Sequence, residues 1–154
     1  MCIYTFMNDL NPDPMAVANC TCFNLRKAAR SVTQLYDGAL KPSGLRATQF
    51  TLLCAIENNG PAGITELARV LVTDRTTLTR NLKPLIEKEL IESVDSADRR
   101  ERPVALTPKG HKVLSGALPL WRDAQTRVTN ILGRGNWARL LGDLNDAVRQ
   151  TRAM

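Results

Sequence analysis

A short run of threonines, arginines and a lysine has the chemistry needed to bind a nucleic acid. It follows Asp74 and reads RTTLTRNLK. At 100° per residue, one face of a helix would carry four polar side chains: Thr76, Thr79, Arg80 and Lys83. Threonine can contact base edges and the methyl group of thymine, and arginine can donate hydrogen bonds to guanine or to phosphate. These residue types predict a surface that contacts duplex DNA.

The ends and the opposite face of this predicted helix fit that interpretation. Asp74 is a natural cap, which leaves backbone N–H groups and the positive end of the helix dipole in the first turn. An apolar face is predicted to point inward and comprises Leu78, Leu82, Leu85 and Ile86. The predicted DNA-binding residues of the helix are Arg75, Thr76, Thr77, Thr79, Arg80 and Lys83. Taken alone, the helix is equally compatible with a solvated, charged face.

A second cationic cluster follows in the segment DSADRRERP. It lies between two short β-prone runs, LIESV and RPVALT, which predict a hairpin. Arginines at its tip could enter the narrow, electronegative minor groove of A·T-rich DNA. The predicted residues at this turn are Asp98, Arg99, Arg100 and Arg102. Asp98 could hold the Arg100 guanidinium in place, whereas Arg99 also fits a merely solvated turn.

Composition restricts the remaining classes of function. The 154 residues carry a formal net charge of +6, which favours an anionic partner. The chain contains one histidine and four cysteines without a C-x-x-C pair, so no metal site or cofactor is predicted. An enzyme with a cysteine nucleophile would need a base beside the thiol, and His111 is far along the chain from every cysteine. The distance of this histidine from the cysteines predicts that the protein is not an enzyme. The sequence has no secretory signal and no apolar run of about 18 residues, so the protein is predicted to be cytoplasmic.

Apolar periodicity predicts further helices around these two clusters. The first is a long amphipathic helix over residues 15–40. A second is predicted in TQFTLLCAIENNG with Thr48 as its cap, and a short third in TELARVL with Thr65 as its cap. A very brief link joins the third helix to the one after Asp74, and such a pair forms a helix-turn-helix.

Two more amphipathic helices follow the hairpin. Thr107 is predicted to cap a helix that begins with Pro108 and whose apolar stripe breaks at Gly133 and Gly135. The last helix, NWARLLGDLNDAVRQ, carries its stripe at Trp137, Leu140, Leu141, Leu144 and Val148. The first helix and the last two present more apolar surface than the central elements could cover. A second copy of the chain is the simplest cover, so a homodimer is predicted.

The segment LVTDRTTLTRNLKPLIEKELI and the segment DRRERPVALTPKG resemble the MarR family of winged helix-turn-helix regulators. The family's motifs occur here as Asp74 to Thr77, Asp98 to Arg100 and Leu106 to Gly110. Val72 and Glu89 stand where the family frequently has glycine, and Pro84 lies inside the predicted recognition helix, where it removes one backbone hydrogen bond.

This resemblance implies a fold and a function. The fold would be mainly α with a small β-hairpin wing, as one domain over residues 1–154. Residues 46–107 would form the winged helix-turn-helix DNA-binding module, and 15–40 and 108–151 the dimerisation helices. The function would be that of a homodimeric repressor bound to a pseudo-palindromic operator in double-stranded DNA and released by a small-molecule inducer or by thiol oxidation. The alternative is a winged-helix module that binds an acidic protein and not DNA.

The segment CTCFNLRKAAR is similar to the first helix of the organic-peroxide-sensing branch of that family. The resemblance implies that Cys22, followed by Phe23, is a redox sensor and that Tyr36 supports its thiolate. Arg26 replaces a second supporting tyrosine, although a nearby arginine can itself lower the pKa of a thiol. The other interpretation is that Cys22, which lies on the apolar stripe, is a small core residue.

Overall fold

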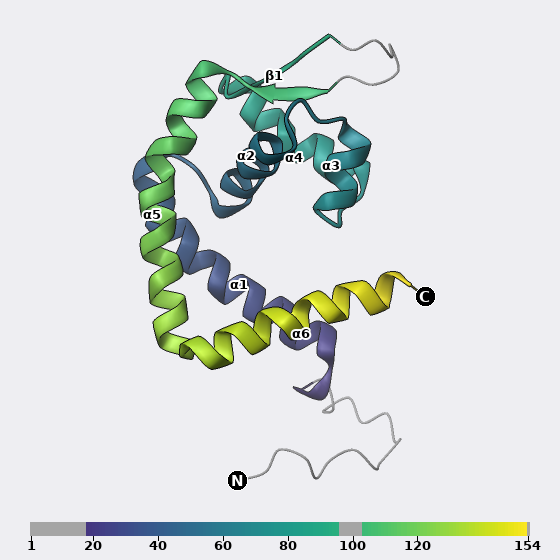
Figure 1. The fold of residues 1–154 in the computed structure, drawn as a ribbon, viewed down its shortest axis with the longest axis vertical. Coiled ribbons are helices and arrows are strands. Elements are labelled where there is room, and N and C mark those ends of the chain that lie inside the picture. The colour runs from purple at the N-terminus through teal and green to yellow at the C-terminus, as the bar shows by residue number, and fades with distance from the viewer. Residues whose placement is uncertain (1–17, 96–102, 154) are drawn as a thin grey trace. The chain divides into compact units, whose positions relative to one another are not determined.

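The computed structural model describes residues 18–95 and 103–153 (Figure 1). The chain divides into two compact units, Met1–Gln34 and Leu35–Met154. Helix α1, Thr21–Leu40, begins in the first unit and ends in the second. The remaining helices and strands belong to the second unit.

Helix α1 is shorter at its N-terminal end than its apolar periodicity predicts. Met15, the predicted start, lies outside the described residues, and α-helical bonding begins only at Thr21. The side-chain amide of Asn24 donates hydrogen bonds to the carbonyl oxygens of Ala18, at 2.7 Å, and Cys20, at 3.0 Å. Such side-chain bonds compete with continued helical bonding, so they favour a tight turn before Thr21. The predicted C-terminal end at residue 40 is confirmed.

A short connection leads from α1 into helix α2, Ala47–Asn59. The 3-10 turn η2, Lys41–Ser43, ends at Gly44, whose φ of 72° is left-handed. The predicted cap at Thr48 is wrong, because α2 begins one residue earlier. The Ala47 N–H instead donates to Oδ1 of Asp37 at 2.7 Å. A carboxylate from the end of α1 thus satisfies a backbone donor at the start of α2.

Helices α3, Ile64–Val70, and α4, Arg75–Glu87, form the predicted helix-turn-helix. Gly63 occupies the N-cap of α3, so the prediction that Thr65 caps this helix is wrong. Both helices pack on α2 (Figure 1). The short turn between them brings α4 back across α2 with one face outward.

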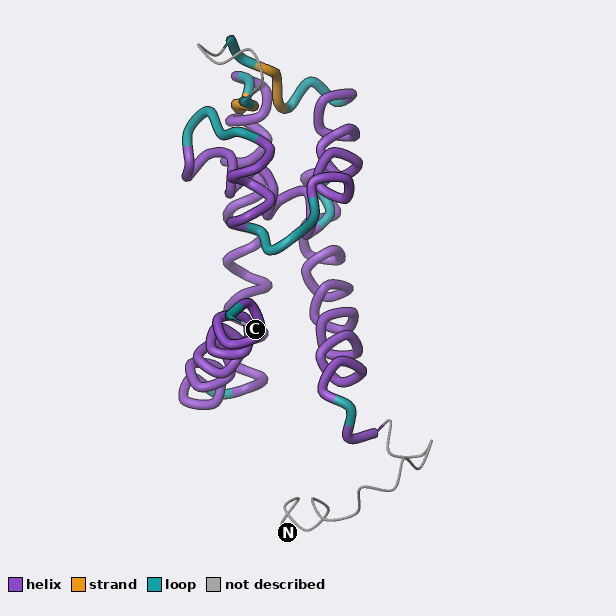
Figure 2. Tube along the Cα trace, turned by 90° about the vertical axis from the view of Figure 1, so that its right-hand side faces the viewer, coloured by secondary structure: helices purple, strands orange, loops and turns teal. Residues whose placement is uncertain are grey.

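The predicted hairpin is confirmed. Strand β1, Ile91–Ser93, pairs antiparallel with β2, Val104–Leu106 (Figure 2). On its other edge β2 forms a bridge with Ala62, through hydrogen bonds of 3.0 and 3.1 Å with Val104. The hairpin is therefore tied to the segment between α2 and α3.

A single apolar core holds α2, α3, α4 and the hairpin together. Its largest fully buried side chains are Leu40, Leu53, Ile56, Leu67, Leu78, Leu82, Leu85 and Ile91. No polar or charged side chain is buried in the part of the chain that the structure describes. The core therefore fixes the position of α4 by apolar packing, which leaves its polar side chains available to solvent.

Helix α5, Pro108–Leu132, starts where the sequence predicts. The hydroxyl oxygen of Thr107 accepts a hydrogen bond from the Gly110 N–H at 3.0 Å, and it donates to the Glu89 carbonyl oxygen at 2.7 Å. One threonine thus caps α5 and ties it to the end of α4. Further along α5, Trp121 stacks on Phe50 of α2 with ring centroids 5.9 Å apart.

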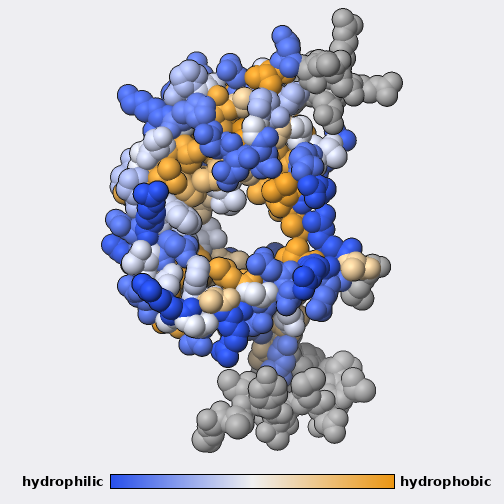
Figure 3. Space-filling view, in the orientation of Figure 1, coloured by the Kyte–Doolittle hydropathy of each residue, from blue (hydrophilic) through white to orange (hydrophobic). Residues whose placement is uncertain are grey.

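Helix α6, Arg134–Arg152, buries none of its residues in the single chain. Gly133, with a φ of 78°, separates it from α5, whereas Gly135 lies inside α6 and does not break a helix as predicted. The stripe residues Leu140, Leu141 and Val148 are each more than 40% exposed. Apolar side chains likewise remain visible among charged ones on the face in Figure 3. Burial of apolar surface contributes about 25 cal/mol of free energy per Å², so a partner that covers this surface would be stabilising.

Candidate nucleic-acid interface

The first turn of α4 is fixed by its cap. Asp74 has extended backbone, and its carboxylate accepts a hydrogen bond from the Thr77 N–H at 2.8 Å. Hydrogen bonds from the side chain and backbone of Thr77 hold the pKa of Asp74 below its usual range. The carboxylate satisfies one free donor of the helix start, so α4 begins at Arg75 as predicted.

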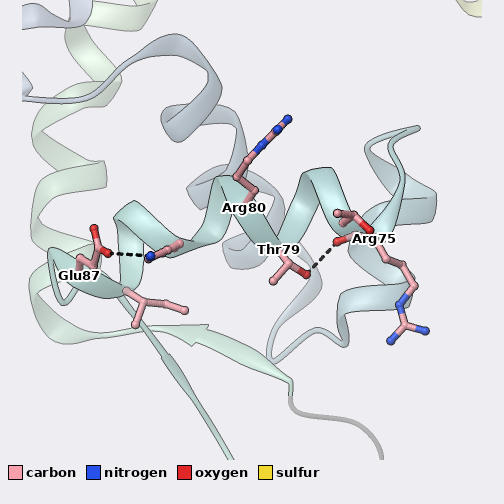
Figure 4. A pocket seen from close by; sticks show the side chains of 7 residues that line it. Arg75, Thr79, Arg80 and Glu87 are labelled. Carbon is pink, nitrogen blue, oxygen red and sulfur yellow. Dashed lines mark hydrogen bonds and ion pairs between the residues drawn. The ribbon is translucent and has the colours of Figure 1, made fainter.

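The outward face of α4 lines a shallow hollow of about 790 Å³ (Figure 4). Its lining residues are Arg75, Thr76, Thr79, Arg80, Lys83, Ile86 and Glu87. The fold thus brings together every predicted recognition-helix residue except Thr77. That side chain is half-buried and bonds the capping carboxylate of Asp74.

The charges along this hollow are mainly positive. Arg75, Arg80 and Lys83 are exposed cations on its wall. Among the described residues, Glu87 is the one acid that lines the hollow, and its Oε1 lies 3.8 Å from Nζ of Lys83. Both partners are more than 60% exposed, so water screens this ion pair and it contributes little to stability. Lys83 can therefore exchange Glu87 for a stronger anion.

Two residues of the hollow, Ile86 and Glu87, are not among the predicted DNA-binding residues. Ile86 was assigned to the inward face with the leucines, but it is 50% exposed and lines the hollow. One residue beyond Leu85 is a rotation of 100°, which carries Ile86 to the border between the two faces. Glu87 follows on the outward side. At 100° per residue, the angular positions of both residues indicate that they reach the outward side. Ile86 was assigned to the core only because it is hydrophobic.

The residues on either side of α4 have left-handed backbone although neither is glycine. Val72 has a φ of 52° and Glu89 a φ of 58°. These are the two positions at which the sequence departs from the glycine frequent in the resembling family. The turn before α4 is closed by a hydrogen bond from the Thr73 N–H to the Ala68 carbonyl oxygen, at 3.0 Å. The turn after α4 is closed by a hydrogen bond from the Leu90 N–H to the Leu85 carbonyl oxygen, at 2.9 Å. Both residues thus take a conformation that they disfavour, inside turns closed by backbone hydrogen bonds.

The hairpin carries the second predicted cluster. Asp98, Arg99, Arg100 and Arg102 lie outside the described residues. The strands leading to them are anchored, because Ile91, Val104 and Leu106 are buried in the core. The last described link across the hairpin is a hydrogen bond from the Val94 N–H to the Pro103 carbonyl oxygen, at 2.9 Å.

The predicted redox residues occupy different parts of α1. Cys22 lies in its first turn and is exposed in the single chain. Tyr36 lies near the C-terminal end, where its hydroxyl donates to Oε1 of Gln125 at 2.6 Å and partial burial raises its pKa. Cys54 is half-buried, and burial together with the charge of Glu57 raises the pKa of its thiol. Exposure makes Cys22 more accessible to an oxidant than Cys54.

Comparison with known proteins assigns the chain to a family. Residues 45–101 match the model of the MarR family. Over 118 residues the chain is 30% identical to the HTH-type transcriptional repressor NicR of Pseudomonas putida, an alignment that covers 76% of this chain and 75% of NicR. The chain belongs to the MarR family.

Two solved structures support this membership along most of the chain. The M. tuberculosis transcriptional regulator MosR, in complex with DNA, is 40% identical with a TM-score of 0.80, covering 87% of this chain and 97% of MosR. The transcriptional repressor CouR, bound to p-coumaroyl-CoA, is 25% identical with a TM-score of 0.79, covering 90% and 98%. The predicted fold class, a mainly α winged helix-turn-helix with a hairpin, is thus confirmed for this MarR-family chain.

The described parts of the MarR-family chain contain neither a metal-binding cluster nor a membrane-spanning helix. Within residues 18–95 and 103–153, no three His, Cys, Asp or Glu side chains are grouped so that they could hold a metal ion. In the same ranges, no helix has both the length and the apolar character that a membrane span requires.

Proposed function

We propose that this protein is a homodimeric, sequence-specific transcriptional repressor that contacts duplex DNA with α4 and the hairpin. The observation that carries the proposal is the hollowed, cationic outer face of α4, held in place by a core of leucines on the opposite face. MosR, which is similar over most of the chain, was solved with DNA. A protein-docking module would not need threonines and cations gathered on one helix face.

Each polar residue of the interface has a proposed role. Arg75, Arg80 and Lys83 bind phosphates or guanine, and Thr76 and Thr79 contact base edges. Thr77 acts through the cap of α4. At the hairpin, Arg100 and Arg102 enter the minor groove, Asp98 holds Arg100, and Arg99 adds charge.

We propose that residues 46–107 form the DNA-binding module and that 15–40 and 108–151 build the dimer. Support comes from exposed apolar side chains in α1, α5 and α6: Phe23, Leu25, Val32, Ile131, Leu132, Leu140, Leu141 and Val148. A twofold dimer would place its two recognition helices in successive major grooves, about 34–36 Å apart, and would bind a pseudo-palindromic operator.

The proposed signal for release is a small-molecule inducer or oxidation of a thiol. CouR was solved with p-coumaroyl-CoA, which supports ligand control as one route. For the second route, the exposed thiol of Cys22 is the proposed sensor and Tyr36 its proposed support. Peroxide would convert the thiolate to a sulfenic acid.

Neither catalysis nor a cofactor is part of this proposal. NicR and MosR are named as a transcriptional repressor and a transcriptional regulator, respectively. The proposed role requires access to DNA, which agrees with the cytoplasmic location predicted from the sequence.

Selection from a random duplex library tests the function directly. The full-length protein is incubated with the library at moderate salt, and bound duplexes are amplified and sequenced. The expected result is a pseudo-palindromic site whose half-sites are about one helical turn apart, or a multiple of it. Affinity for the selected site should fall with salt at about 0.9 in log slope per neutralised phosphate. Failure to enrich any sequence, together with a monomeric mass in solution, would overturn the proposal.

A further inference from the structure

Thr79 has its hydroxyl engaged inside α4. Its Oγ1 donates a hydrogen bond to the Arg75 carbonyl oxygen at 2.8 Å (Figure 4). This bond, to the carbonyl four residues earlier, fixes the side-chain rotamer of a helical threonine. The hydroxyl hydrogen is therefore not available to a base, and the γ-methyl is the apolar group that this exposed side chain offers to the hollow.

Ile86 lies two turns further along α4, on the same side of the helix as the γ-methyl of Thr79, and together the two side chains form an apolar strip. A spacing of seven residues rotates by 700°, so Ile86 and Thr79 lie within about 20° of each other around the helix axis. Both line the hollow, and Ile86 is 50% exposed. At 1.5 Å per residue, they are about 10 Å apart along the axis, which is the length of about three base steps.

Cations surround this strip. Arg75 is in the first turn of α4, Lys83 lies between Thr79 and Ile86 along the helix, and Arg80 also lines the hollow. If the phosphates of a duplex bind these three cations, the floor of the groove between its two backbones lies against Thr79 and Ile86. In the major groove of B-DNA, the apolar group at that place is the C5-methyl of thymine.

We infer that Thr79 and Ile86 form an apolar strip that recognises thymine methyl groups in each operator half-site. This inference rests on the proposed DNA-binding function and adds the base that the middle of α4 selects. Arg75, Arg80 and Lys83 supply the phosphate and guanine contacts around the strip. Because the two residues are about 10 Å apart, the sensitive thymines lie about three base steps from each other when α4 follows the groove.

Replacement of thymine by uracil removes only the C5-methyl and leaves base pairing intact. The selected operator is synthesised with deoxyuridine at one thymine at a time, symmetrically in both half-sites. Binding of the full-length protein is then measured by fluorescence anisotropy. Loss of one methyl contact is expected to weaken binding about fourfold per half-site, which corresponds to about 0.8 kcal/mol. Other thymines in the same duplex serve as internal controls and should tolerate uracil.

Two substitutions of Thr79 separate a methyl contact from a hydroxyl contact. Thr79→Val keeps a methyl and removes the hydroxyl, so sensitivity to uracil at the matching thymine should persist. Thr79→Ser keeps the hydrogen bond to Arg75 and removes the methyl. It should weaken binding to the thymine operator about as much as uracil does, and uracil at the matching position should then have no further effect. The reverse pattern, in which Thr79→Ser keeps the sensitivity to uracil and Thr79→Val loses it, would overturn the inference.

Ile86→Ala tests the second half of the strip. The side chain is half exposed and alanine favours helix, so the unfolding midpoint should change little. Affinity should fall by fourfold or more, and sensitivity to uracil should disappear at a second thymine. If uracil is tolerated at every thymine of an operator that the protein binds well, the strip does not read thymine although the repressor function stands. If no duplex is bound, both ideas fail.

Discussion

The carbonyl oxygen of Leu90 lies directly against the α-carbon of Gly110, so that a Cβ on Gly110 would overlap this oxygen. The same oxygen accepts a hydrogen bond from the Thr107 N–H at 3.1 Å. The first turn of α5 therefore packs against the start of β1 without an intervening side chain. Only glycine permits this approach, which gives a physical reason for the glycine in the segment LTPKG.

Gly110→Ala should destabilise the protein. The overlapping atom belongs to the backbone, so the first turn of α5 must move, at a cost of about 1–3 kcal/mol. Urea unfolding at fixed protein concentration measures the change. Gly116→Ala is the matched control, since Gly116 lies in the same helix with open space around its α-carbon. It should stabilise the helix by about 0.5–1 kcal/mol. Equal effects of the two substitutions would contradict the close contact.

Val72→Gly should make the protein more stable. A valine at a φ of 52° is strained by about 1–2 kcal/mol, and glycine relieves most of this strain while it adds freedom to the unfolded chain. The expected net gain is about 1 kcal/mol in thermal or urea unfolding. Val70→Gly is the control, because this valine is also partly exposed but lies in α3. There glycine should destabilise, and a loss of stability in both variants would show that Val72 is not strained.

Helix caps were predictable from the sequence, whereas the backbone conformation at Val72 was not. Caps such as Asp74 and Thr107 were predictable because their partners lie three residues away. The left-handed backbone at Val72 was not predictable, because it occurs in the turn between α3 and α4 against the preference of valine itself. The resemblance pointed to the position without supplying the conformation.

Contacts between distant segments were likewise beyond a reading of local pattern. Asp37 takes the role predicted for Thr48 from the preceding helix, ten residues before the amide that it binds. Tyr36 bonds Gln125 across 89 positions of sequence. The face of α4 was largely predictable, because helical periodicity alone determines it. Ile86 was the exception, since hydrophobicity and angular position gave opposite answers at the border of that face.

Stability at low pH should depend on Asp74. Hydrogen bonds from Thr77 hold its pKa in the folded protein below the ordinary value of 3.8. A depressed folded pKa means that the contribution is complete above the unfolded pKa and is lost as the pH falls through the folded value. Asp74→Asn keeps a capping oxygen but does not titrate. The parent should therefore lose stability relative to this variant below about pH 4, as judged by urea midpoints. A constant difference between pH 6 and pH 3 would contradict this role.

Arg80→Ala should weaken operator binding while leaving the fold intact. The side chain is exposed on the wall of the hollow, so its loss removes a phosphate or guanine contact without disturbing the core. Affinity should fall about tenfold at moderate salt, and the salt slope should drop by about 1.8 per dimer if each copy neutralises one phosphate. Arg127→Ala, on the exposed side of α5, is the matched control. Equal salt slopes for parent and Arg80→Ala would exclude Arg80 from phosphate binding.

Arg100→Ala tests the hairpin in a gel-shift assay with the selected operator. The proposed minor-groove contact predicts a strong loss of operator affinity, greatest for sites with A·T-rich flanks, where the minor groove is narrow. The dimer should keep its stability, because this contact forms only with DNA. Retention of parental affinity at moderate salt would refute a role for Arg100 in binding.

Cys22→Ser decides whether oxidation of this thiol releases the operator. The variant should bind the operator like the parent, because serine keeps the size of the side chain, but peroxide should no longer dissociate the complex. Cys54→Ser is the control: burial and Glu57 raise the pKa of Cys54, which lowers its thiolate fraction and its reactivity, so this variant should respond like the parent. Titration of the bound complex with an organic peroxide, followed by anisotropy, measures both. Release that persists in Cys22→Ser would rule out Cys22 as the sensor and leave a small-molecule inducer as the proposed signal.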